Sequence, residues 1–134
     1  MATLIAHSPE PATQHFVDHL ATLLKQQRGI TLAVVDLARA DRYIDNVDAV
    51  IVVAEADAET FNTQARNFLA AEHAELAEKS LFVVALGTVA GLTETQQLAM
   101  DAFQPRDTAY FRTDVLDESA LNAWVGQIYR RGVA

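Results

Sequence analysis

The chain has 134 residues, of which 51% are hydrophobic, and this length and composition fit a single domain spanning residues 1–134. Its 18 acidic and 10 basic residues leave a net charge of −8, which argues against a surface that binds nucleic acid or anionic lipids. The absence of cysteine excludes disulfides, thiolate metal sites and cysteine catalysis.

The beginning of the chain has no basic segment followed by a long apolar one, so no signal peptide is expected. The longest uncharged stretch around an apolar run, residues 80–93, is too short to span a bilayer and contains two glycines. We therefore expect a cytoplasmic protein without membrane insertion.

The chain begins with a short apolar run and a helical pattern. Residues 3–6 predict a strand, and residues 12–28 predict a helix that ends at Gly29, a residue type common just after helix ends. The apolar side chains of this helix share one face: Phe16, Val17, Leu20, Leu23 and Leu24. The alternation of a strand with an amphipathic helix indicates an α/β fold.

The middle of the chain continues this alternation. Residues 31–35 and 49–54 predict strands, because both runs are apolar and rich in β-branched residues. The polar segment 36–48 between them predicts a loop. A second helix, continuing with a break to Lys79, is predicted from apolar residues at helical spacing: Phe61, Ala65, Phe68 and Leu69.

The last third adds two more strands and two helices. Residues 81–86 and 108–112 predict the strands, and Thr93 with Gln96 predicts a capping box for a helix through Phe103. The final helix is predicted with Asp117 as its N-cap. Its apolar stripe consists of Leu121, Trp124, Val125, Ile128 and Tyr129.

Continuous apolar strands are typical of a parallel sheet that is covered by helices on both faces. Right-handed crossovers then predict a doubly wound three-layer sandwich, with a five-stranded parallel sheet of order 2-1-3-4-5. In such folds, ligands bind beyond the carboxyl ends of the strands, near the point where the strand order reverses. The loops at residues 7–13, 55–59 and 87–92 are therefore the predicted ligand-binding loops.

Three segments carry a resemblance to a known family: residues 4–8, 34–40 and 45–52. The chain resembles the flavodoxin-like proteins that include the menaquinone-dependent protoporphyrinogen dehydrogenases, and the likeness covers most of the chain. The resemblance implies a flavodoxin-like fold and binding of flavin mononucleotide (FMN). It implies phosphate contacts and a border of the flavin ring at these residues: Ser8 and Thr13 for the phosphate, and Glu55, Ala56, Gly87 and Thr88 for the ring.

The first loop departs from the family pattern. Pro9 and Pro11 have no N–H to donate to a phosphate, and Pro11 replaces the glycine expected there. Glu10 adds a negative charge where an anion should bind. The segment is better explained as a helix start, with Ser8 as the cap and proline in the first turn.

The second loop also departs from the family pattern. It has three acidic residues, Glu55, Asp57 and Glu59, and no aromatic residue before Phe61. Phe61 fits the buried stripe of the second helix, and the acids are interpreted as caps of that helix. In the third loop, Gly87 and Thr88 leave room for a ring to approach.

Other kinds of site are weaker. A receiver domain shares this topology, but Ser8, Ala54 and Arg112 stand where its acidic pocket, phosphorylated aspartate and lysine are needed. His7 and nearby acids are a candidate divalent-metal site, with a solvated acidic rim as the preferred interpretation; the acids are Glu10, Glu55 and Asp57.

The histidines on the helices are interpreted as surface residues. His15 and His19 have the i, i+4 spacing of metal ligands, but the glutamate of the zincin motif is missing. His73 lies near Glu72 and Glu75 and is expected on the surface as well. No metal site is predicted.

These observations predict a flavodoxin-like domain with a degenerate phosphate loop. The predicted function is that of a non-enzymatic binding or regulatory protein without a resident cofactor, whose partner is another protein or a second copy in a homodimer. The alternative is an FMN-binding redox protein that performs electron transfer or quinone-linked oxidation, in which the cofactor would carry the chemistry.

Overall fold

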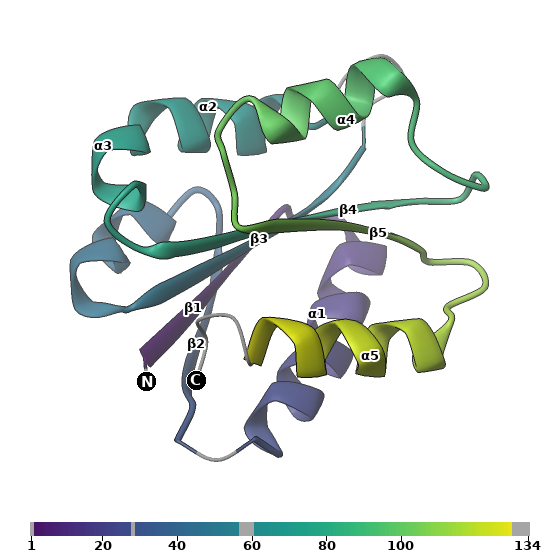
Figure 1. Cartoon of the computed structure of the whole chain (residues 1–134), viewed down its shortest axis with the longest axis horizontal. Coiled ribbons are helices and arrows are strands. Elements are labelled where there is room, and N and C mark those ends of the chain that lie inside the picture. The colour runs from purple at the N-terminus through teal and green to yellow at the C-terminus, as the bar shows by residue number, and fades with distance from the viewer. Residues whose placement is uncertain (1, 28, 57–60, 130–134) are drawn as a thin grey trace.

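The computed structural model describes residues 2–27, 29–56 and 61–129, in which strands and helices alternate (Figure 1). The strands are β1 (Ala2–His7), β2 (Thr31–Asp36), β3 (Ala49–Glu55), β4 (Ser80–Gly87) and β5 (Asp107–Arg112). The α-helices are α1 (Pro11–Lys25), α2 (Thr63–Ala71), α3 (His73–Leu76), α4 (Glu94–Asp101) and α5 (Glu118–Ile128). Two short 3₁₀ helices, η1 (Ala40–Arg42) and η2 (Ile44–Asn46), connect β2 to β3.

The strands form one five-stranded sheet of order β2-β1-β3-β4-β5, and every neighbouring pair is parallel. This arrangement confirms the predicted fold class and strand order. The order reverses between β1 and β3, which places the loops after these strands at the switch point of the fold.

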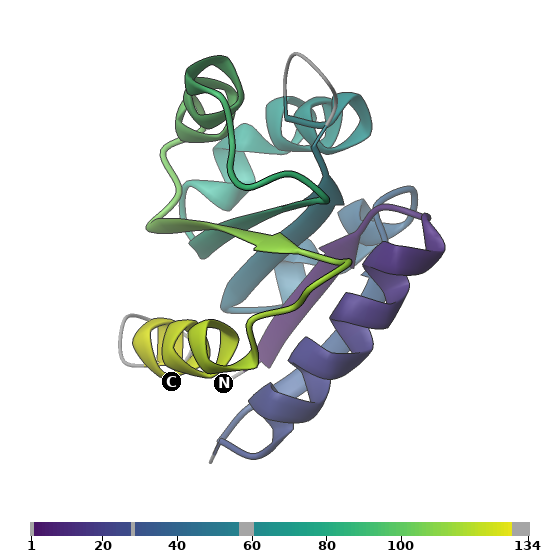
Figure 2. The same ribbon diagram turned by 90° about the vertical axis from the view of Figure 1, so that its right-hand side faces the viewer.

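Helices cover both faces of the sheet (Figures 1 and 2). On one face, α1 and α5 pack against the sheet. The ring centroid of Phe111 lies 5.4 Å from that of Phe16 and 6.2 Å from that of Trp124. On the other face, α2, α3 and α4 pack against the remaining strand side chains. The inner strands β3 and β4 are therefore buried on both faces, which explains their continuous apolar sequence.

Two predicted helix caps are confirmed. Thr93 Oγ1 accepts from the Gln96 N–H at 3.1 Å, and Gln96 Oε1 accepts from the Thr93 N–H at 2.8 Å, so the capping box of α4 is complete. Asp117 Oδ1 accepts from the Ala120 N–H at 3.0 Å and caps α5.

The first helix ends earlier than predicted. α1 stops at Lys25, and the N–H groups of Gln26 and Gln27 bond to the carbonyls of Leu23 and Leu24, three residues back. These bonds tighten the last turn of the helix and give its final carbonyl groups hydrogen-bond partners before Gly29. Gly29 adopts a φ of 78° in the turn to β2, so its conformational freedom serves that turn rather than the end of the helix.

The prediction of a plain polar loop over residues 36–48 is wrong. The segment folds into η1 and η2, and its apolar residues enter the core on the α2 side: Leu37, Ala40, Ile44 and Val47. Charged residues stand between these positions, so neither a helical nor a strand period is visible in the sequence.

The interpretation of the loop acids as caps of α2 is also wrong. The N-cap is Asn62, whose Oδ1 accepts from the Ala65 N–H at 3.0 Å. Glu55 belongs to β3, and Asp57 and Glu59 lie outside the described residues. Phe61 is fully buried in the core, as predicted, but it precedes α2 and is not part of the helix to which the sequence assigned it.

Among the described residues, no helix combines the length and the apolar character needed to cross a membrane.

Candidate functional site

A pocket of about 370 Å³ opens at the carboxyl ends of β3 and β4. It brings together the residues predicted to border a flavin ring: Glu55, Ala56, Gly87 and Thr88. Further lining residues come from α4, β5 and the loops beside them, and they include Val89, Thr93, Gln96, Tyr110 and Thr113. Ser8 and Thr13, predicted for the phosphate, are not among the lining residues.

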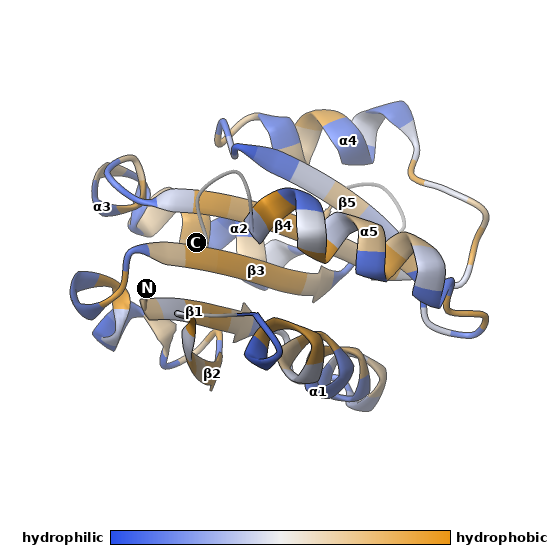
Figure 3. Cartoon of the chain, turned by 60° about the horizontal axis from the view of Figure 1, so that its bottom comes forward, coloured by the Kyte–Doolittle hydropathy of each residue, from blue (hydrophilic) through white to orange (hydrophobic). Residues whose placement is uncertain are grey.

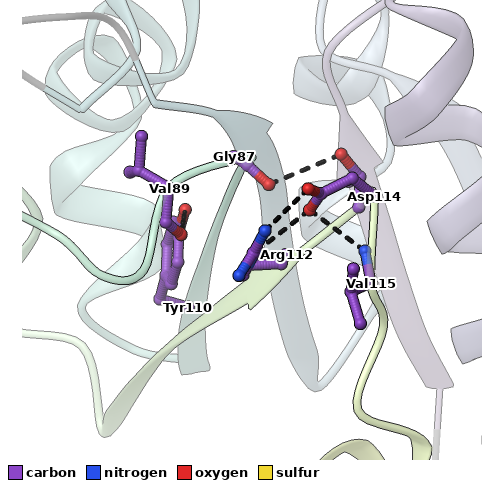
Figure 4. A network of polar contacts seen from close by, with 7 residues as sticks. Gly87, Val89, Tyr110, Arg112, Asp114 and Val115 are labelled. Atoms are coloured by element: carbon purple, nitrogen blue, oxygen red, sulfur yellow. Dashed lines mark hydrogen bonds and ion pairs between the residues drawn. The ribbon is translucent and has the colours of Figure 1, made fainter.

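Tyr110 occupies the space beside Gly87 (Figure 4). A Cβ atom added to Gly87 would lie 2.6 Å from the Tyr110 hydroxyl oxygen and 3.2 Å from its ring, so glycine is required by close packing. The Tyr110 hydroxyl donates to the Val89 carbonyl at 2.7 Å. The room that the sequence indicated at Gly87 is therefore partly filled by the chain itself. Sequence reasoning missed Tyr110 because no local pattern shows that this side chain reaches across to the loop after β4.

Hydrogen bonds hold the segment that follows β5 against the end of β4 and against β5 itself. The Thr113 N–H donates to the Gly87 carbonyl at 2.9 Å. Arg112 Nη2 donates to Asp114 Oδ2 at 2.7 Å, and this hydrogen bond lowers the pKa of the Asp114 carboxyl (Figure 4). The bond between Thr113 and Gly87 joins two residues that line the pocket.

The side chains of Ser8 and Thr13 lie close together, but their hydroxyl groups are hydrogen-bonded to each other. Both are fully buried, and Ser8 Oγ donates to Thr13 Oγ1 at 3.3 Å. The Ser8 N–H donates to the Val53 carbonyl at 3.0 Å, which extends the contact between β1 and β3. The prediction that Ser8 caps α1 is therefore wrong: the N-cap is Glu10, which makes no side-chain cap bond, and Pro11 opens the helix.

Glu10 places negative charge at the start of α1. Its Oε2 is buried and has no hydrogen-bond partner in the structure. Burial raises the pKa of Glu55, and the charge of Glu10 raises it further. The two carboxylates therefore repel each other across the edge of the sheet where β1 and β3 end.

No group of three or more histidine, aspartate or glutamate side chains able to hold a metal ion occurs among the described residues. In the candidate rim, His7 Nδ1 lies 2.9 Å from the Ser8 carbonyl, and Asp57 lies outside the described part of the chain. His15 and His73 are exposed, as predicted, and His19 Nε2 lies 3.7 Å from Glu118 Oε1.

The parallel sheet has the strand order 2-1-3-4-5, and the pocket lies at the carboxyl ends of its strands, as expected for a flavodoxin-like fold. A family model described as a flavodoxin domain matches residues 4–126. The chain belongs to the flavodoxin domain family. No curated protein matches it in sequence.

Solved structures of flavodoxins share the fold of this family member. A short-chain flavodoxin associated with a PDU bacterial microcompartment superposes with a TM-score of 0.75 at 12% identity, covering 98% of each chain. The flavodoxin of Streptococcus pneumonia TIGR4 gives 0.68 at 14%, covering 97% of this chain and 98% of that one. The Fusobacterium nucleatum flavodoxin bound to flavin mononucleotide gives 0.64 at 14%, covering 98% of each. At this identity the likeness shows the fold alone.

Proposed function

We propose that this flavodoxin-family protein is a non-enzymatic binding or regulatory domain that does not hold FMN by its phosphate. The observation that carries the proposal is the buried hydrogen bond between Ser8 and Thr13. A phosphate at the head of α1 needs hydroxyl and amide donors that are free to turn toward it. Here both hydroxyls are withdrawn from solvent and paired with each other.

The backbone of the same loop supports this proposal. The Ser8 N–H is bonded to Val53, and Pro9 and Pro11 have no N–H. Hydrogen bonds to a charged group contribute about 1.5–3 kcal/mol each, so the loss of several of them removes most of the free energy of phosphate binding. The buried, unpartnered oxygen of Glu10 adds repulsion to any approaching anion. A cytoplasmic location, expected from the sequence, is part of the same proposal.

The alternative function, an FMN-dependent redox protein, rests on the pocket at the carboxyl edge. That pocket gathers the residues that the family resemblance assigns to the ring, Glu55, Ala56, Gly87 and Thr88. The neighbouring Fusobacterium nucleatum flavodoxin is bound to flavin mononucleotide. In this alternative the ring would bind beside Gly87, and a loop other than residues 8–13 would have to carry the phosphate.

Titration of the purified protein with FMN and with riboflavin, followed by flavin fluorescence, tests the proposal. We expect no saturable quenching by micromolar FMN and no gain in affinity from the phosphate. Stoichiometric binding of FMN, tighter than that of riboflavin, would overturn the proposal, because only a working phosphate site distinguishes the two ligands.

A loop variant tests the cause. Pro9→Gly combined with Glu10→Thr and Pro11→Gly restores amide donors and removes the carboxylate. We expect FMN to bind this variant at least about tenfold more tightly than it binds the parent chain, with riboflavin unchanged. Glu118→Gln, at the exposed start of α5, changes the net charge equally and is the control. An equal gain in the control would contradict a local cause.

A further inference from the structure

A second pocket, of about 210 Å³, lies at the opposite end of the sheet from the pocket beside Gly87. It opens between the turn from α3 to β4 and the loop from α4 to β5, which lie side by side in Figures 1 and 2. Because β4 and β5 are parallel and both begin here, we call it the amino-edge pocket. Its lining shares no residue with the pocket beside Gly87.

The charged residues that line the amino-edge pocket are both basic. They are Lys79 and Arg106, and no aspartate or glutamate belongs to the lining. The whole chain has 18 acidic and 10 basic residues, so a lining with cations and no acid is contrary to its average composition. The pocket beside Gly87, in contrast, is lined by Glu55. The amino-edge pocket is therefore suited to an anion.

Both cations can bind an added anion. Lys79 is half-buried and forms no ion pair with any residue that the structure describes. Lysines that lose contact with water are normally paired with an acid, so its ammonium group lacks the usual partner. The guanidinium of Arg106 has five N–H donors, so it can bind a carboxylate alongside its other contacts.

The acids near α3 gather away from this pocket. Partial burial raises the pKa of the Glu72 carboxyl, and the charges of Glu75, Asp41 and Asp45 raise it further. These four acids therefore lie near one another, where α3 meets the 3₁₀ segment, and none of them lines the amino-edge pocket. Their charge does not neutralise its two cations.

The rest of the lining is largely apolar. Leu69, Leu76 and Leu81 are 0–5% exposed and belong to the core on the α2 side of the sheet. Phe103 is half-buried and packs against the same core. Figure 3 shows β4, on which Leu81 lies, mainly in apolar colours. A ligand in this pocket therefore meets an apolar surface as well as positive charge.

Gln104 adds a polar group held in a strained conformation. Its φ is 54°, and it is the one non-glycine residue with a positive φ among those described. It also precedes Pro105, and residues before proline normally adopt an extended backbone. Strained residues of this kind cluster at ligand sites. The exposed side-chain amide of Gln104 lines the amino-edge pocket and can donate a hydrogen bond there.

We propose that the amino-edge pocket binds a small organic carboxylate with an apolar body. The carboxylate accepts hydrogen bonds from Lys79 and Arg106, and the apolar body contacts Phe103 and the buried leucines. Inorganic phosphate would use the charges alone and leave the apolar lining in water. The proposal goes beyond the proposed function and does not depend on it, because neither Ser8 nor Thr13 lines this pocket.

Titration with sodium benzoate and sodium butyrate, followed by amide chemical shifts in NMR spectra, tests the proposal. We expect saturable shifts at residues 76–81 and 103–106, with a dissociation constant on the order of millimolar for so small a ligand. Benzylamine, which has the same ring and the opposite charge, should not bind there. Inorganic phosphate should bind at least about tenfold more weakly than benzoate. Phosphate binding as tight as that of benzoate, or the absence of shifts at these residues with both carboxylates, would refute the proposal.

A charge variant tests the role of the cation. We expect Lys79→Gln to weaken benzoate binding at least about fivefold, because the carboxylate loses a charged donor. Lys25→Gln, in the exposed last turn of α1, changes the net charge equally and should bind benzoate like the parent chain. Urea denaturation checks that both variants remain folded. Unchanged affinity in Lys79→Gln, or an equal loss in Lys25→Gln, would rule out a specific site at this edge of the sheet.

Discussion

Gly87 and Tyr110 depend on each other. The phenol ring lies against the glycine, and its hydroxyl holds the Val89 carbonyl, so the ring fixes the loop that forms one wall of the pocket. A side chain at position 87 would push the ring away and break that hydrogen bond. The shape of the pocket is therefore set by the absence of a single methyl group.

Replacing Gly87 with alanine tests this dependence. We expect Gly87→Ala to lower the free energy of unfolding by about 1–3 kcal/mol, because the new methyl group overpacks against Tyr110. Gly91→Ala is the matched control: nothing lies within 4 Å of its added Cβ, and its φ is not positive. Urea denaturation measures both, and equal effects would show that the contact with Tyr110 is unimportant.

Asn62 connects two secondary-structure elements. Its Oδ1 caps α2 through the Ala65 N–H, and its Nδ2 donates to the Glu55 carbonyl at the end of β3 at 2.8 Å. Asn62 is only 7% exposed, so neither bond is readily replaced by water. One side chain thus sets where the second helix begins relative to the strand that borders the pocket.

Asn62→Ala should lower the free energy of unfolding by more than the loss of an ordinary N-cap does. Loss of an N-cap costs about 0.5–2 kcal/mol, and the uncapped Glu55 carbonyl adds to it. Asn62→Asp keeps the acceptor for Ala65 but cannot donate to Glu55, so it should fall between the parent and the alanine variant. Thermal unfolding ranks the three proteins, and an aspartate variant as unstable as alanine would contradict the role of the cap.

At the scale of the whole molecule, the net charge of −8 makes separate copies of the chain repel one another. Added salt screens this repulsion.

Much of the fold could be predicted because local signals sufficed. The uninterrupted apolar runs of β3 and β4 identified strands buried on both faces, and the capping box at Thr93 and Gln96 fixed the start of α4. The segment around Ile44 could not be predicted, because its burial follows no regular period. The position of Ser8 before two prolines predicted a helix cap. In the structure its N–H bonds to the Val53 carbonyl, which places Ser8 in the core.

The sequence by itself determined the class of fold, its strand order and the missing donors at Pro9 and Pro11, because periodicity and residue chemistry are local properties. Only the tertiary structure decided that Ser8 and Thr13 bond to each other and that Tyr110 fills the space beside Gly87. These are relations between residues that the folded chain brings together, and no local pattern encodes them.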